Sequence, residues 1–133
     1  MKLLLSKEII LQNQEKFKPI ACIYFLIKNN EIVYVGQTID LYARLSAHNR
    51  EKDFDAYSFV ECNIDELDAL EILYIVKFKP KYNTRLPNNP YFMTLEQIKR
   101  TLGCGLRTVK KIMRERDIKP IWMDYYDIRK FQQ

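Results

Sequence analysis

Residues 21–37 read ACIYFLIKNNEIVYVGQ, two apolar runs separated by Lys28-Asn29-Asn30. Both runs are rich in β-branched and aromatic residues, which favour strands. The two asparagines tolerate the positive φ angles that tight turns need. The pattern therefore predicts a β-hairpin with strands over residues 21–27 and 31–37.

Residues 65–76 predict an amphipathic helix that carries a carboxylate where an apolar side chain is expected. Leu67, Glu71 and Ile75 are spaced four apart, so they share one face of this helix. Burying a lone carboxylate costs on the order of several kcal/mol unless a cation, a metal or hydrogen bonds compensate. The plainer alternative is a half-exposed Glu71 at the edge of the apolar stripe.

Residues 40–48 predict a second helix with a similar anomaly. Leu41, Arg44, Leu45 and His48 have the i, i+3, i+4, i+7 spacing of a core-facing stripe, and two of these side chains are basic. His48 is the only histidine of the chain. A single arginine in such a stripe usually extends past the core to water. Two basic groups here, with a carboxylate on the other helix, are instead typical of a site that cleaves phosphodiesters.

The order of these residues resembles the nuclease module of the GIY-YIG endonucleases. The positions that follow the family's order and spacing are Tyr24 in Cys22-Ile23-Tyr24, Tyr34 in Tyr34-Val35-Gly36, Arg44, His48, Glu71 and Asn83. Each short motif is weak alone, but the ordered set is a strong joint signal over about residues 19–85. The resemblance implies an α+β fold with a small antiparallel or mixed three-stranded sheet flanked by helices.

The resemblance also implies a divalent metal cofactor, Mg²⁺ or Mn²⁺, with Glu71 as its protein ligand. A hard cation held by one carboxylate, water and substrate phosphate is normal for Mg²⁺. Arg44 would clamp the phosphate with its planar guanidinium group. These two residues would therefore bind the metal and the scissile group.

By the same resemblance, Tyr24 would take a proton from the attacking water. A free phenol is a poor base near neutral pH, so a nearby cation or metal must favour its phenolate. His48 and Tyr34 are candidates to hydrogen-bond and orient Tyr24, and Asn83 would close the site from behind.

Tyr24 and Tyr34 can share a site only if both face the same side of the hairpin. A regular two-residue Asn29-Asn30 turn would place them on opposite faces, because successive strand side chains alternate. A three- or five-residue loop, or a β-bulge, restores a common face. We predict the three-residue loop, with Tyr24 paired to Tyr34.

The first strand motif departs from the family, which usually has glycine where this chain has Cys22. Cysteine is small and packs like a modest hydrophobe. If the glycine only lets a neighbouring group approach, Cys22 can replace it with little loss. If the glycine lets the backbone meet a DNA phosphate, activity would suffer. We favour the first alternative, because the residues implied in the chemistry are all present.

Composition limits the class of protein. At 47% apolar residues the chain of 133 residues can form a core, and it has no apolar run long enough to cross a bilayer. The apolar run at residues 3–5 is too short for a signal peptide. The three widely spaced cysteines form no C-x-x-C pair. We therefore expect a cytoplasmic protein with reduced thiols and no membrane partner, and the resemblance implies a bacterial or phage-infected cell.

The net charge of +5 lies in the last third of the chain. Residues 1–90 hold 12 basic and 12 acidic residues, whereas residues 91–133 hold 10 basic and 5 acidic ones. The stretch Leu86-Pro87-Asn88-Asn89-Pro90 interrupts helix and strand patterns. We predict a nuclease domain with an N-terminal helix over 1–86 and a second domain over 87–133. The helix, expected over residues 6–17, would cover the sheet.

Residues 94–116 predict two short helices joined by a turn that contains Gly103 and Gly105. Thr94 and Gln97 fit a capping box at the start of the first helix. One face of the second helix carries a polar and mostly basic set: Arg107, Thr108, Lys110, Lys111 and Arg114. The segment loosely resembles the winged helix-turn-helix modules of phage excisionases. That resemblance implies DNA binding by these five residues, a wing over 118–126 and a closing turn over 127–131. The plainer alternative is a solvated helical hairpin.

These features together predict a metal-dependent endonuclease that cuts double-stranded DNA and is targeted by its C-terminal module, like phage or homing nucleases. One active site cuts one strand, so the protein is expected as a monomer or a DNA-induced dimer. The alternative is a non-catalytic DNA-binding regulator whose nuclease-like domain is vestigial. A loss of Glu71, Arg44 or Tyr24 would have favoured that alternative, and the chain retains all three.

Overall fold

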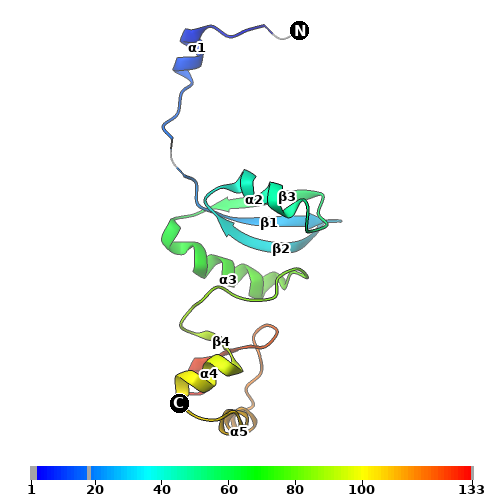
Figure 1. Ribbon diagram of the computed structural model, residues 1–133, viewed down its shortest axis with the longest axis vertical. Coiled ribbons are helices and arrows are strands. Elements are labelled where there is room, and N and C mark those ends of the chain that lie inside the picture. The colour runs from blue at the N-terminus through cyan, green and yellow to red at the C-terminus, as the bar shows by residue number, and fades with distance from the viewer. Residues whose placement is uncertain (1–2, 18, 133) are drawn as a thin grey trace.

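A computed structural model describes residues 3–17 and 19–132 (Figure 1). A three-stranded antiparallel sheet lies between helices, and a smaller helical unit follows it along the chain. The elements in chain order are α1 (Lys7–Gln12), β1 (Cys22–Lys28), β2 (Glu31–Thr38), α2 (Leu41–His48), β3 (Ala56–Glu61), the 3₁₀ helix η1 (Ile64–Glu66), α3 (Leu67–Phe78), β4 (Phe92–Thr94), α4 (Leu95–Leu102), α5 (Leu106–Arg116), β5 (Tyr125–Asp127) and the 3₁₀ helix η2 (Ile128–Lys130). The α+β class predicted from the sequence is confirmed.

The hairpin of β1 and β2 corrects the predicted register. Its turn is the two-residue Asn29-Asn30, with φ angles of 50° and 65°, and Lys28 pairs with Glu31. The register then shifts at a bulge, so that Leu26 pairs with Tyr34 and Tyr24 with Gly36. The predicted three-residue loop and the pairing of Tyr24 with Tyr34 are therefore wrong. The bulge, which was the other way to bring both tyrosines to one face, is what the chain uses.

The sheet has the order β2-β1-β3, so β1 is the central strand. Its alternating side chains divide between two cores. Ile23 and Phe25 pack with Leu67, Ile72 and Ile75 of α3. On the other side, Tyr24 and Leu26 pack with Leu41 and Leu45 of α2. The two helices therefore cover opposite faces of the sheet, above and below it in Figure 1.

Helix α1 is shorter than predicted and does not cover the sheet. Ser6 caps its N-terminus by accepting a hydrogen bond from the backbone N–H of Ile9. The helix has no buried residue, and Figure 1 shows it standing away from the sheet. Phe17, which follows it, is 97% exposed. The expectation that this helix protects the sheet is therefore wrong.

The C-terminal unit consists of α4 and α5 beside the two-stranded sheet of β4 and β5. Thr94 and Gln97 form the predicted capping box at the start of α4. Gly103 ends α4 in the left-handed conformation, with φ of 68°, which glycine adopts without strain. The core of the unit is entirely apolar and consists of Ile98, Val109, Ile118, Ile128 and Phe131.

Two aromatic residues of the C-terminal unit reach beyond that core. Trp122 and Tyr125 belong to the same apolar cluster as Val35, Ile72 and Ile75 of the sheet and α3. The hydroxyl of Tyr125 also accepts a hydrogen bond from the backbone N–H of Leu86, at 3.1 Å. The core that α3 builds on the sheet therefore continues across the predicted boundary at residues 86–87.

Within residues 3–17 and 19–132, no helix combines the length and the apolar character needed to cross a membrane.

Candidate active site

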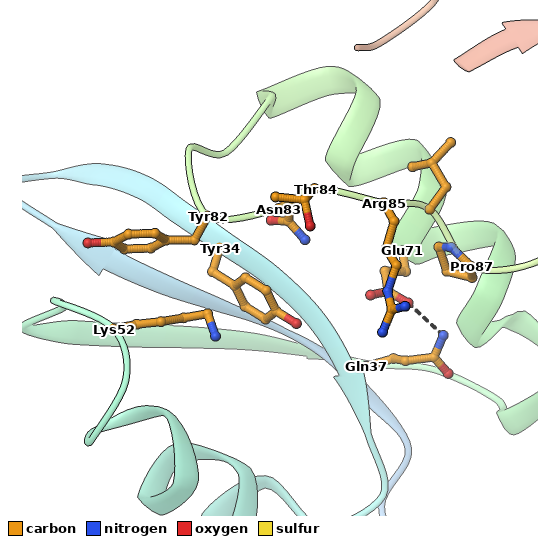
Figure 2. A pocket seen from close by; sticks show the side chains of 10 residues that line it. Tyr34, Gln37, Lys52, Glu71, Tyr82, Asn83, Thr84, Arg85 and Pro87 are labelled. Atoms are coloured by element: carbon orange, nitrogen blue, oxygen red, sulfur yellow. Dashed lines mark hydrogen bonds between the residues drawn. The ribbon is translucent and has the colours of Figure 1, made fainter. Parts of the chain in front are cut away.

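A cavity of about 460 Å³ opens beside β2 and α3 (Figure 2). It is lined by Tyr34, Gln37, Lys52, Glu71, Tyr82, Asn83, Thr84, Arg85, Leu86 and Pro87. Three of the residues singled out from the sequence, Tyr34, Glu71 and Asn83, thus meet at one cavity.

Glu71 is buried on α3, as its place in the apolar stripe predicted. Glu71 is only 9% exposed, and its Oε2 accepts a hydrogen bond of 2.6 Å from the side-chain amide of Gln37. The same amide nitrogen also donates to Asp68, at 2.7 Å. Burial raises the pKa of the Glu71 carboxyl, the Gln37 hydrogen bond lowers it, and the charge of Asp68 raises it. The Gln37 amide therefore offsets only part of the cost of burying this carboxylate.

Tyr24 and His48 form the second polar contact of the site. The Oη of Tyr24 and the Nε2 of His48 are 2.6 Å apart and buried. The Tyr34 ring lies on the same side, with ring centroids 6.1 Å from Tyr24 and 4.9 Å from His48. Burial raises the pKa of the Tyr24 phenol, Tyr34 and Glu71 raise it further, and Arg44 lowers it. Together these effects favour the neutral phenol in the protein alone.

Gly36 is required by the position of the Tyr24 ring. Tyr24 pairs with Gly36 across the hairpin, and its ring lies over the Cα of Gly36. A Cβ added at residue 36 would overlap the ring, with the Cε1 atom of Tyr24 at 2.8 Å. The last residue of Tyr34-Val35-Gly36 therefore leaves room for the tyrosine of the other strand.

Asn83 fixes the outer edge of β2 to the segment that follows α3. Its Oδ1 accepts from the backbone N–H of Val35 and its Nδ2 donates to the carbonyl of Val35, both at 2.9 Å. Asn83 is only 4% exposed. The strand neighbour of Tyr34 is thereby held in place by two buried hydrogen bonds.

The geometry agrees with a family match over much of the chain. The profile of the GIY-YIG catalytic domain matches residues 20–98, which is more than half of the sequence. The chain belongs to the GIY-YIG family. It is also similar to UvrABC system protein C of Fervidobacterium nodosum, with 30% identity over an alignment 89 residues long; the match covers 59% of this chain and 16% of that protein. The chain thus spans a small part of this curated relative, and no solved structure gives a significant match.

Two arginines flank the GIY-YIG site, and only Arg44 was anticipated. Both are exposed. Burial and the charge of Glu71 raise the pKa of the Tyr34 phenol, and the charges of Arg44 and Arg85 oppose that rise. Figure 2 shows Arg85 pointing into the cavity toward Glu71 and Gln37. Arg44 extends from α2, which also carries His48.

Sequence reasoning missed three polar residues of this cavity. Gln37 directly follows the Tyr34-Val35-Gly36 motif, Lys52 comes four residues after His48, and Arg85 comes two after Asn83. Only adjacency to recognised motif residues could have indicated them, because none interrupts an apolar pattern.

The donor set limits how a metal could bind. Among the described residues, no three His, Cys, Asp or Glu side chains gather as a metal site. The buried Glu71 carboxylate nevertheless borders a polar cavity, with the Gln37 side chain beside it. One carboxylate and open space for water fit a hard divalent ion, which keeps several of its waters.

Cys22, which replaces the family's glycine, is not among the residues that line this cavity. It is 1% exposed and pairs with Thr38 on one neighbouring strand and Glu61 on the other. Burial raises the pKa of its thiol, and Cys62 and Glu61 raise it further. The side chain is therefore accommodated inside the fold, and the small effect of Cys22 on activity stays a prediction.

The five residues predicted to bind DNA all lie on α5 and are exposed: Arg107, Thr108, Lys110, Lys111 and Arg114. Val109, between them in sequence, is fully buried in the core of the C-terminal unit. Figure 1 shows α5 at the end of the molecule opposite α1, with α3 between it and the sheet. The structure thus does not bring this set to the cavity around Glu71.

Proposed function

We propose that the protein is a metal-dependent endonuclease that hydrolyses phosphodiester bonds of double-stranded DNA. The observation that carries the proposal is the buried Glu71 carboxylate at a polar cavity that Tyr34 also lines, with the Tyr24–His48 contact beside the Tyr34 ring. Membership of the GIY-YIG family supports the reaction class.

Glu71 would hold one Mg²⁺ or Mn²⁺, which supplies a Lewis acid for the phosphate and its leaving oxygen when bound. Gln37 would orient the carboxylate through its 2.6 Å hydrogen bond. The Gln37 amide donates to Oε2 of Glu71. The other carboxylate oxygen, Oε1, would bind a ligand in the cavity.

Arg44 and Arg85 would bind the substrate phosphate from two sides. Each presents a planar set of donors that matches phosphate oxygens. Arg85 lines the cavity directly, whereas Arg44 is placed by α2 next to the tyrosines. Their two charges would also compensate the negative charge that substrate brings to Glu71.

Tyr24, as phenolate, would take a proton from the attacking water. Its high pKa in the protein alone means that charge near the site must change before it can act. His48 would hold the Tyr24 oxygen through the 2.6 Å contact, and Tyr34 would pack against both. Asn83 would keep the β2 backbone in register behind them.

The C-terminal unit would target the nuclease to DNA as a helix-turn-helix module over residues 87–133. Its support is the pair α4 and α5, the turn at Gly103, and an exposed face of α5 with four basic side chains. The predicted wing has less support, since Trp122 and Tyr125 within it are buried against the nuclease core. Binding would be to duplex DNA by a monomer or a DNA-induced dimer, in a phage-like or homing-like role.

A nicking assay on supercoiled plasmid tests the proposal. The full chain is expected to cut with Mg²⁺ or Mn²⁺ and to stop when EDTA is added, and Glu71→Gln is expected to abolish cutting. Glu31→Gln serves as the matched control, because Glu31 is exposed at the far end of β2. DNA binding without metal-dependent cutting by the wild type would instead support a non-catalytic regulator. Cutting by Glu71→Gln at the wild-type rate would exclude Glu71 as the metal ligand.

A further inference from the structure

We propose that Lys52 is a positioning residue that fixes the tautomer of His48, and thereby makes His48 the donor in its hydrogen bond to Tyr24. The inference rests on the proposed nuclease function for its catalytic meaning. The tautomer itself can be measured without any activity.

Lys52 is held against His48 by the turn that follows α2. Its backbone N–H donates to the carbonyl of His48 at 2.9 Å, and its Nζ lies 3.1 Å from Nδ1 of the same residue. The Nζ also lies 4.7 Å from the centroid of the Tyr34 ring. The Lys52 side chain is only 17% exposed, and its Nζ also lies 3.8 Å from the carboxylate of the exposed Glu51. The ammonium group is therefore placed at the imidazole by both backbone and side-chain contacts.

The chemistry of the two groups fixes the direction of each hydrogen bond. An ammonium group has three donors and no acceptor, so Nδ1 of His48 must accept. In a neutral imidazole the hydrogen then resides on Nε2, which faces the Tyr24 oxygen at 2.6 Å. His48 consequently donates to Tyr24 and has no lone pair there to receive the phenol proton.

Burial and the surrounding charges favour the neutral imidazole. The ionisable groups that face it are Lys52, Arg44 and Glu51, with the Tyr24 and Tyr34 hydroxyls beside the ring. Burial lowers the pKa of His48, the charges of Lys52 and Arg44 lower it further, and Glu51 opposes them. A proton on Nδ1 would in addition point at the Lys52 ammonium, which removes the hydrogen bond and adds repulsion.

This arrangement favours the form of Tyr24 that can act as a base. A phenolate oxygen gains a charge-assisted hydrogen bond from Nε2–H, which opposes the effect of burial on its pKa. The other tautomer would accept the phenol O–H and stabilise the neutral form. The Lys52 contact thus selects between two roles of His48 that have the same heavy-atom distance.

The test uses the full chain, whose single histidine gives one imidazole signal set. Long-range ¹H–¹⁵N NMR of histidine-labelled protein at neutral pH is expected to show the hydrogen on Nε2. In Lys52→Met, which keeps the length of the side chain but has no donor, the Nδ1–H tautomer is expected to appear. Lys52→Arg is expected to restore the wild-type pattern. A wild-type hydrogen on Nδ1, or an unchanged tautomer in Lys52→Met, would overturn the proposal.

Cleavage measured against pH links the tautomer to function. Lys52→Met is expected to lower nicking at neutral pH by roughly tenfold, since each unit added to the Tyr24 pKa lowers the phenolate fraction tenfold. The deficit should shrink as pH rises, which a purely structural defect would not produce. Lys81→Met is the matched control, because Lys81 also lies over a tyrosine ring, 4.9 Å from Tyr82, but does not contact His48. A wild-type chain that shows the Nε2 hydrogen but cuts no DNA would refute the nuclease function alone.

Discussion

The two units of this chain handle polar groups in opposite ways. Among the described residues, the buried polar or charged ones are His48, Glu71 and Asn83, and all three belong to the nuclease unit. The core of the C-terminal unit is wholly apolar, and its basic side chains are on the surface. The nuclease unit therefore buries polar side chains at a cost in stability, whereas the C-terminal unit combines an apolar core with surface charge.

Because of this difference, the polar groups of the two units indicate their ligands with different specificity. A buried carboxylate with one amide partner calls for a compensating ligand, so Glu71 points to a specific chemistry. Exposed lysines and arginines on a helix are common and cost little. The exposed charges of α5 therefore indicate a binding partner less specifically than the buried Glu71 carboxylate indicates a ligand.

The largest effect is expected from Trp122→Ala, which asks whether the two units are separate at all. Trp122 is 5% exposed within the nuclease core cluster, so its loss should lower the free energy of unfolding by about 3–5 kcal/mol. Denaturant unfolding followed by circular dichroism measures this. Met123→Ala is the control, since Met123 is 51% exposed. If Trp122→Ala unfolds like Met123→Ala, the shared core contributes little and the units are independent.

The next largest effect is expected from Gly36→Ala in the nuclease unit, compared with Gly105→Ala in the C-terminal unit. Gly36→Ala must displace the Tyr24 ring, and a shift of about 1 Å at a catalytic group costs about 100-fold in rate. Gly105→Ala in the C-terminal unit meets no other described atom within 4 Å and should change stability by less than about 1 kcal/mol. Plasmid nicking and thermal unfolding of both variants test this pair. Equal nicking by both would argue against the assigned position of Tyr24.

Removing surface charge should affect the C-terminal unit without unfolding it. The triple variant Lys110→Gln/Lys111→Gln/Arg114→Gln should reduce the slope of log affinity against log salt by up to about 2.7, at about 0.9 per phosphate contact. Stability should stay within about 0.5 kcal/mol, because these side chains are exposed. The matched triple Lys77→Gln/Lys79→Gln/Lys81→Gln changes the same charge on the nuclease unit. A larger drop in slope for the Lys77/Lys79/Lys81 variant would mean that the nuclease unit, and not α5, provides most of the phosphate contacts.

The smallest effect is on the pH dependence of stability. Because burial raises the pKa of Glu71 in the folded protein, the folded state binds this proton more tightly than the unfolded chain does. Folding is therefore favoured below the ordinary carboxyl pKa, and this contribution is lost as pH rises through the raised pKa. Without metal, Glu71→Gln should be more stable than wild type at neutral pH, with the gain vanishing in acid. Thermal unfolding in EDTA at several pH values measures it, and a constant difference across pH would contradict the burial cost.

Much of the fold was predictable where periodicity is strong. The hairpin strands, α3 with its buried Glu71, and the capping box of Thr94 follow from local patterns. Strand β3 could not be located from the sequence, since all six residues are exposed and no alternation of burial marks it. The bulge before Tyr34 was one of three solutions to the same parity requirement, and nothing local distinguishes them.

The residues of the candidate site also divide into those that the sequence motifs predicted and those that only the structure revealed. Tyr24, Tyr34, His48, Glu71 and Asn83 are brought together as the motif spacing implied. Gln37 and Lys52 became recognisable only through their contacts, 2.6 Å to Glu71 and 3.1 Å to His48. Each is a polar residue in a half-exposed position, where sequence alone predicts nothing unusual.

The single tryptophan gives this chain a built-in optical probe. Trp122 stacks on Tyr125 with ring centroids 5.8 Å apart, where the C-terminal unit joins the core of the sheet and α3. Indole emission depends on exposure to water, so its wavelength reports whether this junction is closed. Separation of the units during DNA binding would shift the emission to the red, while motion within either unit would leave it unchanged. The same residue that closes the junction can thus follow it in real time, without any label.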